Sequence, residues 1–206
     1  MFTPPSLDPG IEISIASQGV SKGLRQTDGP QLIIRPELAI GSLVLGAYYK
    51  NVTSPTADGE AEASVGLRHR IGGFDLSVTA AYKWSTNAHD QPDRDAFEFT
   101  AAVSRHFGPL TPQARLVYSP DELGGTRASL YAEAGAALHL LGGASFSAAL
   151  AHRNRDGAPD YTAFNAGLSY TIAGHFTADL RYYDTAQSRL GAIYRPRLVA
   201  ALRVHF

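Results

Sequence analysis

Apolar and polar residues alternate along most of this chain with a period of two. Residues 60–68 read Glu-Ala-Glu-Ala-Ser-Val-Gly-Leu-Arg, with every odd position apolar and every even position polar or glycine. Residues 198–206 read Leu-Val-Ala-Ala-Leu-Arg-Val-His-Phe and alternate in the same way for most of their length. Because successive side chains of a strand point to opposite faces, this pattern predicts strands with one apolar and one polar face.

Turn signals divide the chain into about twelve such runs, each near the ten residues that a tilted membrane strand needs. The predicted strands are 10–25, 31–40, 42–52, 60–71, 74–85, 95–107, 111–119, 127–140, 144–153, 161–172, 175–184 and 195–206. The alanine-rich stretch 127–141 could also form a helix. Its polar residues share odd positions, however, which favours a strand.

The connections between these runs alternate in length. The tight ones contain glycine at Gly41, Gly72-Gly73, Gly108-Pro109, Gly142-Gly143 and Ala173-Gly174. The longer polar ones are 26–30, 53–59, 86–94, 120–126, 154–160 and 185–194. Short periplasmic turns and long extracellular loops are typical of outer-membrane barrels, and an even number of strands puts both termini on the periplasmic side.

A soluble β-sandwich or lipocalin-like barrel would also alternate, but two features of the apolar face argue against it. This face is rich in alanine, which fills a core poorly and suits contact with lipid. Its aromatic residues gather near the strand ends, as in the two aromatic girdles of a membrane barrel. The predicted girdle residues are Phe74, Tyr82, Trp84, Phe97, Phe107, Tyr118, Phe146, Tyr170, Phe176, Tyr182 and Phe206.

The fold class that follows is all-β, a single closed antiparallel transmembrane barrel over residues 1–206, with residues 1–9 as a short periplasmic segment. The chain has no stretch of 18 apolar residues that would predict a transmembrane helix. No signal peptide opens it, and it ends on Phe206. We therefore expect a mature protein of the Gram-negative outer membrane, whose partners are outer-membrane lipids, lipopolysaccharide and the insertion machinery.

Composition narrows the range of functions. The chain contains no cysteine, which excludes disulfides and thiolate metal sites. Its formal net charge of −1 gives no indication of nucleic-acid binding. We expect no cofactor.

The polar face of the strands should point into the barrel. The residues predicted to line this lumen are Arg35, Glu37, Lys50, Glu60, Glu62, Arg68, Arg70, Lys83, Glu98, Arg115, Glu133, Asp179, Arg181, Arg197 and Arg203. Such a lining fits a porin-like channel for passive diffusion of small polar solutes. It also fits a filled barrel that acts as a structural or partner-binding subunit, because cross-strand ion pairs can close a lumen of this size.

Sequence position also predicts a gradient of charge along the lumen. The acids Glu60, Glu62, Glu98 and Glu133 should lie nearer the long loops. The bases Arg68, Arg70, Arg197 and Arg203 should lie nearer the short turns and the termini. The inward bases outnumber the inward acids, so we expect a mild preference for anions.

Catalytic and metal-binding signals are weak. A lipid-modifying enzyme would need a serine and a histidine on one face, but Ser147 and His152 have opposite parity. No hydrolase, metalloprotease or phosphate-loop motif occurs. Asp90, Asp93 and Asp95 could gather Ca²⁺, but a solvated acidic loop is the better interpretation. We expect no catalytic or metal-ligating residues.

Residues 21–30, Ser-Lys-Gly-Leu-Arg-Gln-Thr-Asp-Gly-Pro, together with the strand that follows, resemble the first hairpin of the TorF family of outer-membrane porins. That family typically reads Arg-Gly-Ile/Val-Ser-Gln-Thr-Asp there, so Gly23, Gln26, Thr27 and Asp28 match. Lys22 replaces the usual arginine and Arg25 the usual serine, and residues 33–36 of the following strand stand where small and glycine-rich residues are common. The resemblance covers about twenty residues and implies an outer-membrane location and a porin-like role.

Overall fold

The structure is a computed structural model that describes residues 7–54, 57–88, 93–124 and 127–206. Within these ranges twelve long strands form one closed antiparallel barrel, which confirms the predicted fold class. The strands are β1 (Leu7–Ala16), β4 (Gln31–Ile40), β5 (Leu43–Asn51), β6 (Gly59–Ile71), β7 (Phe74–Thr86), β8 (Asp95–Arg105), β9 (Leu110–Glu122), β10 (Arg127–His139), β11 (Ala144–Arg155), β12 (Tyr161–Ile172), β13 (Phe176–Asp184) and β14 (Arg197–His205).

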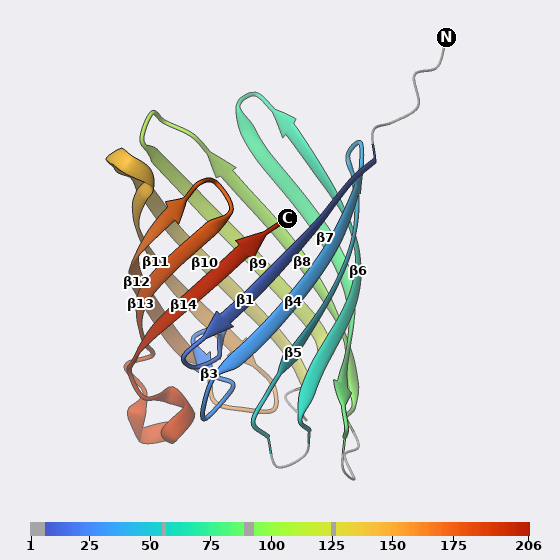
Figure 1. Ribbon diagram of the computed structural model, residues 1–206. Helices are drawn as coiled ribbons and strands as arrows, with labels where there is room; N and C mark the ends of the chain where they lie inside the picture. The colour runs from blue at the N-terminus through green and yellow to red at the C-terminus, as the bar shows by residue number, and fades with distance from the viewer. Residues whose placement is uncertain (1–6, 55–56, 89–92, 125–126) are drawn as a thin grey trace.

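The barrel closes between its first and last strands. Glu12 of β1 pairs with Arg35 of β4 on one side and with His205 of β14 on the other. The backbone groups of Ile11 and Phe206 exchange two hydrogen bonds, which extends this closure to the last residue. Figure 1 shows that β1 begins and β14 ends at the same rim as the short turns, and that the longer loops lie at the opposite rim.

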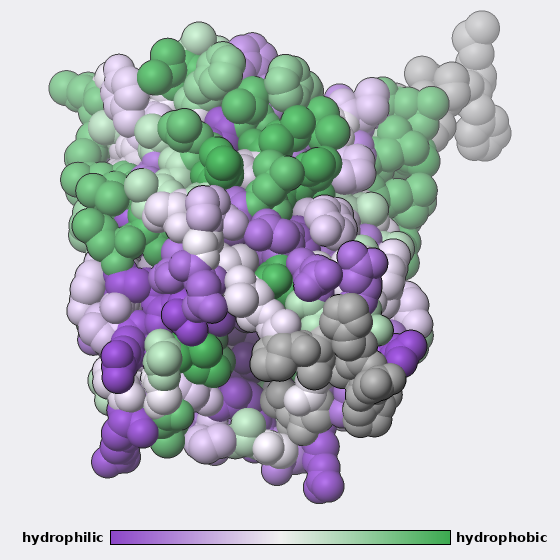
Figure 2. All heavy atoms as spheres, turned by 60° about the horizontal axis from the view of Figure 1, so that its bottom comes forward, coloured by the Kyte–Doolittle hydropathy of each residue, from purple (hydrophilic) through white to green (hydrophobic). Residues whose placement is uncertain are grey.

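Side chains separate by polarity across the barrel wall, as the alternation predicts. Outward residues such as Val78, Leu180 and Leu202 are half exposed although they are apolar. Figure 2 shows hydrophilic atoms gathered over the loop end and hydrophobic atoms on the outer wall above them. No helix in the described ranges is long and apolar enough to cross a membrane.

The predicted first strand, 10–25, is wrong. β1 ends at Ala16, and residues 17–30 fold into the barrel as a loop that carries the short strands β2 (Val20–Ser21) and β3 (Leu24–Arg25). Lys22 and Gly23, at the tip, have φ of 50° and 82°. Positive φ at both central residues defines the tight turn that reverses the chain. The apolar positions change there from odd (Ile11, Ile13 and Ile15) to even (Val20 and Leu24), and this change of parity marks the end of the first strand.

The other elements differ from expectation mainly at their ends. The alanine-rich segment is strand β10, with no helical part. β9 continues past its predicted end at residue 119 to Glu122. Three short 3-10 turns, η1 (Leu141–Gly143), η2 (Ser188–Leu190) and η3 (Ala192–Tyr194), lie in connections.

Candidate functional site

The hairpin of residues 17–30 is held inside the barrel by a lysine between two carboxylates. Lys22 Nζ lies 2.6 Å from Glu98 Oε2 on β8 and 2.7 Å from Glu122 Oε1 on β9. The Lys22 side chain is only 9 % exposed. Buried charges of this kind are tolerated only when they are paired, so the two contacts fix the tip of the hairpin against the opposite wall.

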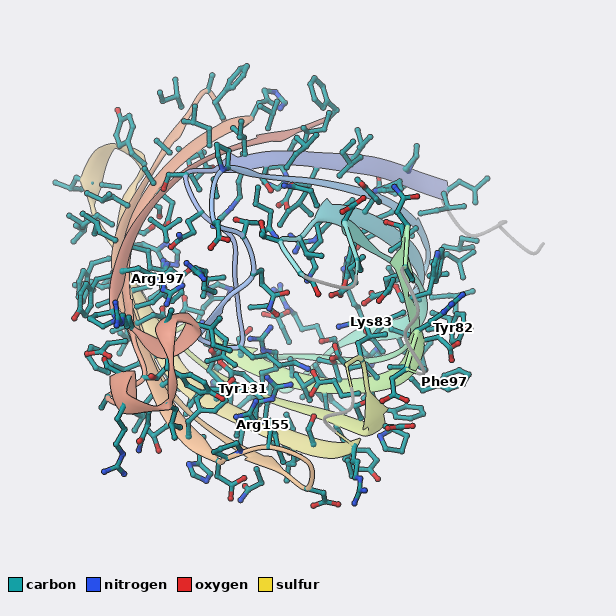
Figure 3. The ribbon with its side chains drawn as sticks, turned by 90° about the horizontal axis from the view of Figure 1, so that it is seen from below. Tyr82, Lys83, Phe97, Tyr131, Arg155 and Arg197 are labelled. Carbon is teal, nitrogen blue, oxygen red and sulfur yellow. The ribbon has the colours of Figure 1, made fainter. Side chains whose placement is uncertain are left out.

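Further ion pairs continue from this anchor along the neighbouring strands. Lys83 Nζ lies 3.0 Å from Glu98, and 3.8 Å from both Glu60 and Glu62. Lys50 Nζ lies 3.1 Å from Glu60. Figure 3 shows Lys83 on the inner side of the wall, whereas its neighbours Tyr82 and Phe97 lie on the outer side.

The second carboxylate of the anchor is shared as well. Glu122 also pairs with Arg153 of β11 and accepts a hydrogen bond of 2.6 Å from Ser129 Oγ. Arg153 in turn donates to the hydroxyl of Tyr161, which donates to the backbone oxygen of Lys22. The hairpin, β9, β11 and β12 are therefore joined by one polar network.

The other side of the hairpin is apolar. Leu24 is buried in a cluster with Tyr161, Ala163 and Tyr194. A Cβ on Gly23 would lie 2.6 Å from the Cβ of Ala163, so the tip packs against β12 at a distance that only glycine allows. The hairpin is thus packed against the wall on one side and ion-paired on the other.

Residues that carry the TorF resemblance also shape the hairpin. Thr27 is 1 % exposed; its Oγ1 accepts from the Gly19 backbone N–H at 2.7 Å and donates to the Gly29 carbonyl oxygen at 2.5 Å. Gln26 Oε1 lies 3.4 Å from Lys50 Nζ, and Asp28 pairs with Arg25 at 2.7 Å.

The periplasmic half of the lumen is more open and its ion pairs are more exposed. Arg68 donates two hydrogen bonds to Glu37, at 2.5 and 2.6 Å, and Arg35 lies 2.8 Å from Glu12. A cavity of about 660 Å³ borders Arg68 and Arg115 on this side. The cavity beside the hairpin has a volume of about 300 Å³.

Most of the predicted lining residues form cross-strand or near-neighbour ion pairs. Besides those described, Arg70 pairs with Asp75, Arg115 with Glu133, and Arg181 with Asp179. The predicted position of Arg197 near the turns is wrong, because it opens β14 directly after the loop 185–196. There its guanidinium donates to the backbone oxygens of Ile193 and Arg195.

The prediction that the loop half of the lumen is acidic is also incomplete, because bases lie there as well. The acids Glu60, Glu62, Glu98 and Glu122 are matched there by the bases Lys22, Lys50, Lys83 and Arg153. Sequence reasoning missed Glu122 because it ended β9 at residue 119. Tyr161 and Tyr194 contact the hairpin, but the sequence shows only that they are aromatic and does not predict this contact.

The predicted girdle residues lie on the outer face. Those at least 39 % exposed are Phe74, Tyr82, Phe97, Phe107, Tyr118, Phe146, Tyr170, Phe176, Tyr182 and Phe206. Trp84 is half-buried and stacks on Tyr82, with ring centroids 5.8 Å apart.

The candidate catalytic pair does not meet. Ser147 Oγ is bound by Arg181, whereas His152 on the same strand bonds to Thr162 Oγ1 at 3.0 Å. No group of three or more potential metal ligands is found in the described part of the chain. Of the three candidate calcium ligands, Asp90 lies outside the described residues.

A family model described as Gram-negative porin matches residues 10–191 of this sequence. The chain belongs to the Gram-negative porin family. It is accordingly an outer-membrane channel for the diffusion of small solutes, and its family and fold point to transport rather than to catalysis.

Solved structures share the fold of this porin at very low sequence identity. The NanC porin superposes with a TM-score of 0.67 at 8 % identity, covering 95 % of this chain and 98 % of its own. The KdgM porin in complex with disordered oligogalacturonate gives 0.65 at 10 % identity, covering 96 % and 99 %. An outer membrane channel from Pseudomonas putida gives 0.55 at 11 % identity, covering 100 % and 96 %. No curated protein sequence matches the chain.

Proposed function

We propose that small polar solutes cross this porin through a lumen whose narrowest part lies beside the hairpin of residues 17–30. The observation that carries this proposal is the Lys22 anchor, which ties the hairpin to β8 and β9 across the interior. The smaller cavity beside the hairpin and the larger one towards the turns support a passage that widens to the periplasm. Solutes would therefore be selected at the extracellular side.

The charges that lack a partner of opposite sign suggest the solute class. Arg155, Arg197 and Arg203 have inward positions and no carboxylate within ion-pair distance among the described residues. Arg155 and Arg197 donate instead to hydroxyl or carbonyl oxygens. Asp8, at the periplasmic rim, has an inward position and no cationic side chain within ion-pair distance among the described residues. This excess of positive charge favours anionic and neutral polar solutes. The KdgM porin, which shares the fold, is known with an oligogalacturonate.

The TorF resemblance gains support from the structural roles of its residues. Gly23 packs closely against Ala163, and Thr27 accepts a hydrogen bond from the Gly19 backbone N–H. We therefore interpret the motif as the signature of a hairpin folded into the lumen. We place the chain among TorF-like porins, as a single barrel domain without catalytic activity. Its partners would be outer-membrane lipids, lipopolysaccharide and, during assembly, the insertion machinery.

Removing the hairpin tests where the passage is narrowest. Ala16 and Gln31 are direct cross-strand partners, so a two-residue Asn-Gly turn can replace residues 17–30 without moving β1 or β4. In planar bilayers we expect stable single-channel steps from the natural protein and a clearly larger conductance from this variant. Shortening the exposed connection 156–159 is the matched control and should leave conductance unchanged. A folded natural protein without channels would favour the filled, structural barrel, and equal conductance of both proteins would place the constriction elsewhere.

A further inference from the structure

An arginine lies on the lipid-facing side of the barrel wall. In the described parts of the barrel strands, Arg105 is the one lysine or arginine at an outward position. It ends β8 at the rim of short turns and pairs directly with Phe74 of β7, itself an outward girdle residue. An unpaired cation there is costly in hydrocarbon unless something at the membrane interface satisfies it.

Two aromatic rings hold the Arg105 side chain. Its Cζ lies 4.7 Å from the ring centroid of Phe74 and 4.7 Å from that of Phe107. A cation near the face of an aromatic ring is stabilised electrostatically, and a planar guanidinium can also stack on such a ring. The N–H groups at its edge then remain available to donate hydrogen bonds to a ligand's oxygens.

Nothing in the described ranges neutralises this arginine. It makes no hydrogen bond or ion pair there, and the nearby carboxylate of Asp75 belongs to the opposite face of the sheet. Asp75 is engaged with Arg70 at 2.6 Å and with His106 at 3.7 Å. Gly73 has no side chain to cover the guanidinium; a Cβ built there would lie 3.8 Å from Arg105 Nε.

We propose that Arg105, clamped between Phe74 and Phe107, binds the phosphodiester of an anionic phospholipid in the periplasmic leaflet. The turns at Gly72-Gly73 and Gly108-Pro109 place this site at the rim, where headgroups lie. A guanidinium edge offers paired donors that match phosphate oxygens. The site lies outside the lumen and does not depend on what the channel carries.

Native mass spectrometry tests the site directly. The porin, in nonionic detergent, is offered equal amounts of dioleoyl-phosphatidylglycerol and dioleoyl-phosphatidylcholine. We expect the natural protein to retain phosphatidylglycerol preferentially, and Arg105→Gln to lower this preference roughly tenfold, equivalent to about 1.4 kcal/mol. Arg189→Gln, which removes the same charge from the exposed turn η2, is the matched control and should retain the lipid fully. Equal retention by Arg105→Gln and the natural protein would overturn the proposal.

Two further measurements distinguish binding by the Arg105 guanidinium beside Phe74 and Phe107 from a general effect of positive charge. Arg105→Lys keeps the charge but loses the planar stack, so it should retain the lipid to an intermediate degree. Inorganic phosphate at millimolar concentration should not displace phosphatidylglycerol, because it lacks the acyl chains that hold the lipid beside the barrel. Displacement would indicate a free-anion site and contradict the lipid assignment. Migration of unboiled samples on gels confirms that each variant is folded, and its single-channel conductance should stay unchanged.

Discussion

Lys22 is the residue on which the position of the hairpin most depends. Its ammonium group is buried between Glu98 and Glu122, yet each carboxylate keeps a second cation, Lys83 or Arg153. Lys22→Met would therefore remove the anchor without leaving an isolated buried charge. We expect a loss of unfolding free energy of about 3 kcal/mol, at the low end for a broken buried pair. We also expect a larger or fluctuating conductance.

Urea unfolding in phospholipid vesicles measures this loss, with Trp84, the single tryptophan, as the fluorescent probe. Arg189→Met is the control, because it removes a charge from an exposed extracellular turn. If Lys22→Met matched the natural protein in both stability and conductance, the anchor would have no role in holding the hairpin.

Substitution of Gly23 allows a second test at the residue scale. It separates the cost of a steric overlap from the cost of a left-handed backbone conformation. Gly23 and Gly72 both have positive φ, of 82° and 56°, but only Gly23 faces a neighbour, the Cβ of Ala163. Gly72→Ala should cost only the left-handed backbone penalty, about 1–2 kcal/mol. Gly23→Ala should cost that and an overpacking penalty of about 1–3 kcal/mol.

Adding Ala163→Gly to Gly23→Ala should recover the overpacking part, since it removes the atom that the new Cβ meets. Chemical unfolding of the natural protein, Gly23→Ala, Ala163→Gly and the double variant gives the coupling energy between the two positions. A double variant no more stable than Gly23→Ala would mean that the hairpin tip does not pack on β12.

At the scale of elements, the strands themselves could be predicted because each one obeys a single local rule. β4 was predicted at its observed bounds, and β12 likewise, since period-two alternation ends there at clear turn signals. The first strand failed because it was extended through residues 17–25, where the apolar positions change parity and the chain forms the short strands β2 and β3. Alternation reports strand conformation, whereas the direction in which a loop folds depends on distant partners such as Glu98.

The outward face of β7 makes the lipid assignment testable. Val78 is apolar, 53 % exposed and in the middle of its strand, where only lipid can cover it. Val78→Arg should lower stability by roughly 2–4 kcal/mol, and Leu202→Arg on β14 should act in the same direction. Leu141→Arg is the control, because Leu141 is 97 % exposed in a periplasmic turn and should tolerate the charge. Unchanged stability of all three variants in vesicles would contradict the position of the membrane.

For the whole molecule, sequence could predict the barrel and which face is polar, but not how the charges pair. Parity puts Arg68 and Glu37 on the same inner face, yet their pairing depends on the register of strands that are not adjacent along the barrel. The network around Glu122 depends in addition on the inward hairpin. Pairing decides which charges remain available to ions, so the count of inward bases and acids alone does not describe the lumen.

Ion selectivity follows from the charges that remain after pairing. Arg155, Arg197 and Arg203 exceed the single unpaired inward acid of the described strands, Asp8, so the lumen should prefer anions mildly. Charges in a narrow passage are screened less than surface charges, but the preference should still weaken as salt rises. Reversal potentials under a KCl gradient measure it, first at low and then at high ionic strength.

Two sets of substitutions identify the groups responsible. Arg203→Gln removes a cation that makes no ion pair in the described ranges, so it should reduce the anion preference without exposing a carboxylate. Arg68→Ala with Arg70→Ala should shift selectivity further towards cations, because it frees Glu37 and Asp75, which these arginines neutralise at 2.5 and 2.6 Å. Clear cation preference of the natural protein would contradict the proposed solute class. If the double substitution left ion selectivity unchanged, the charges in the periplasmic half of the lumen would not determine it.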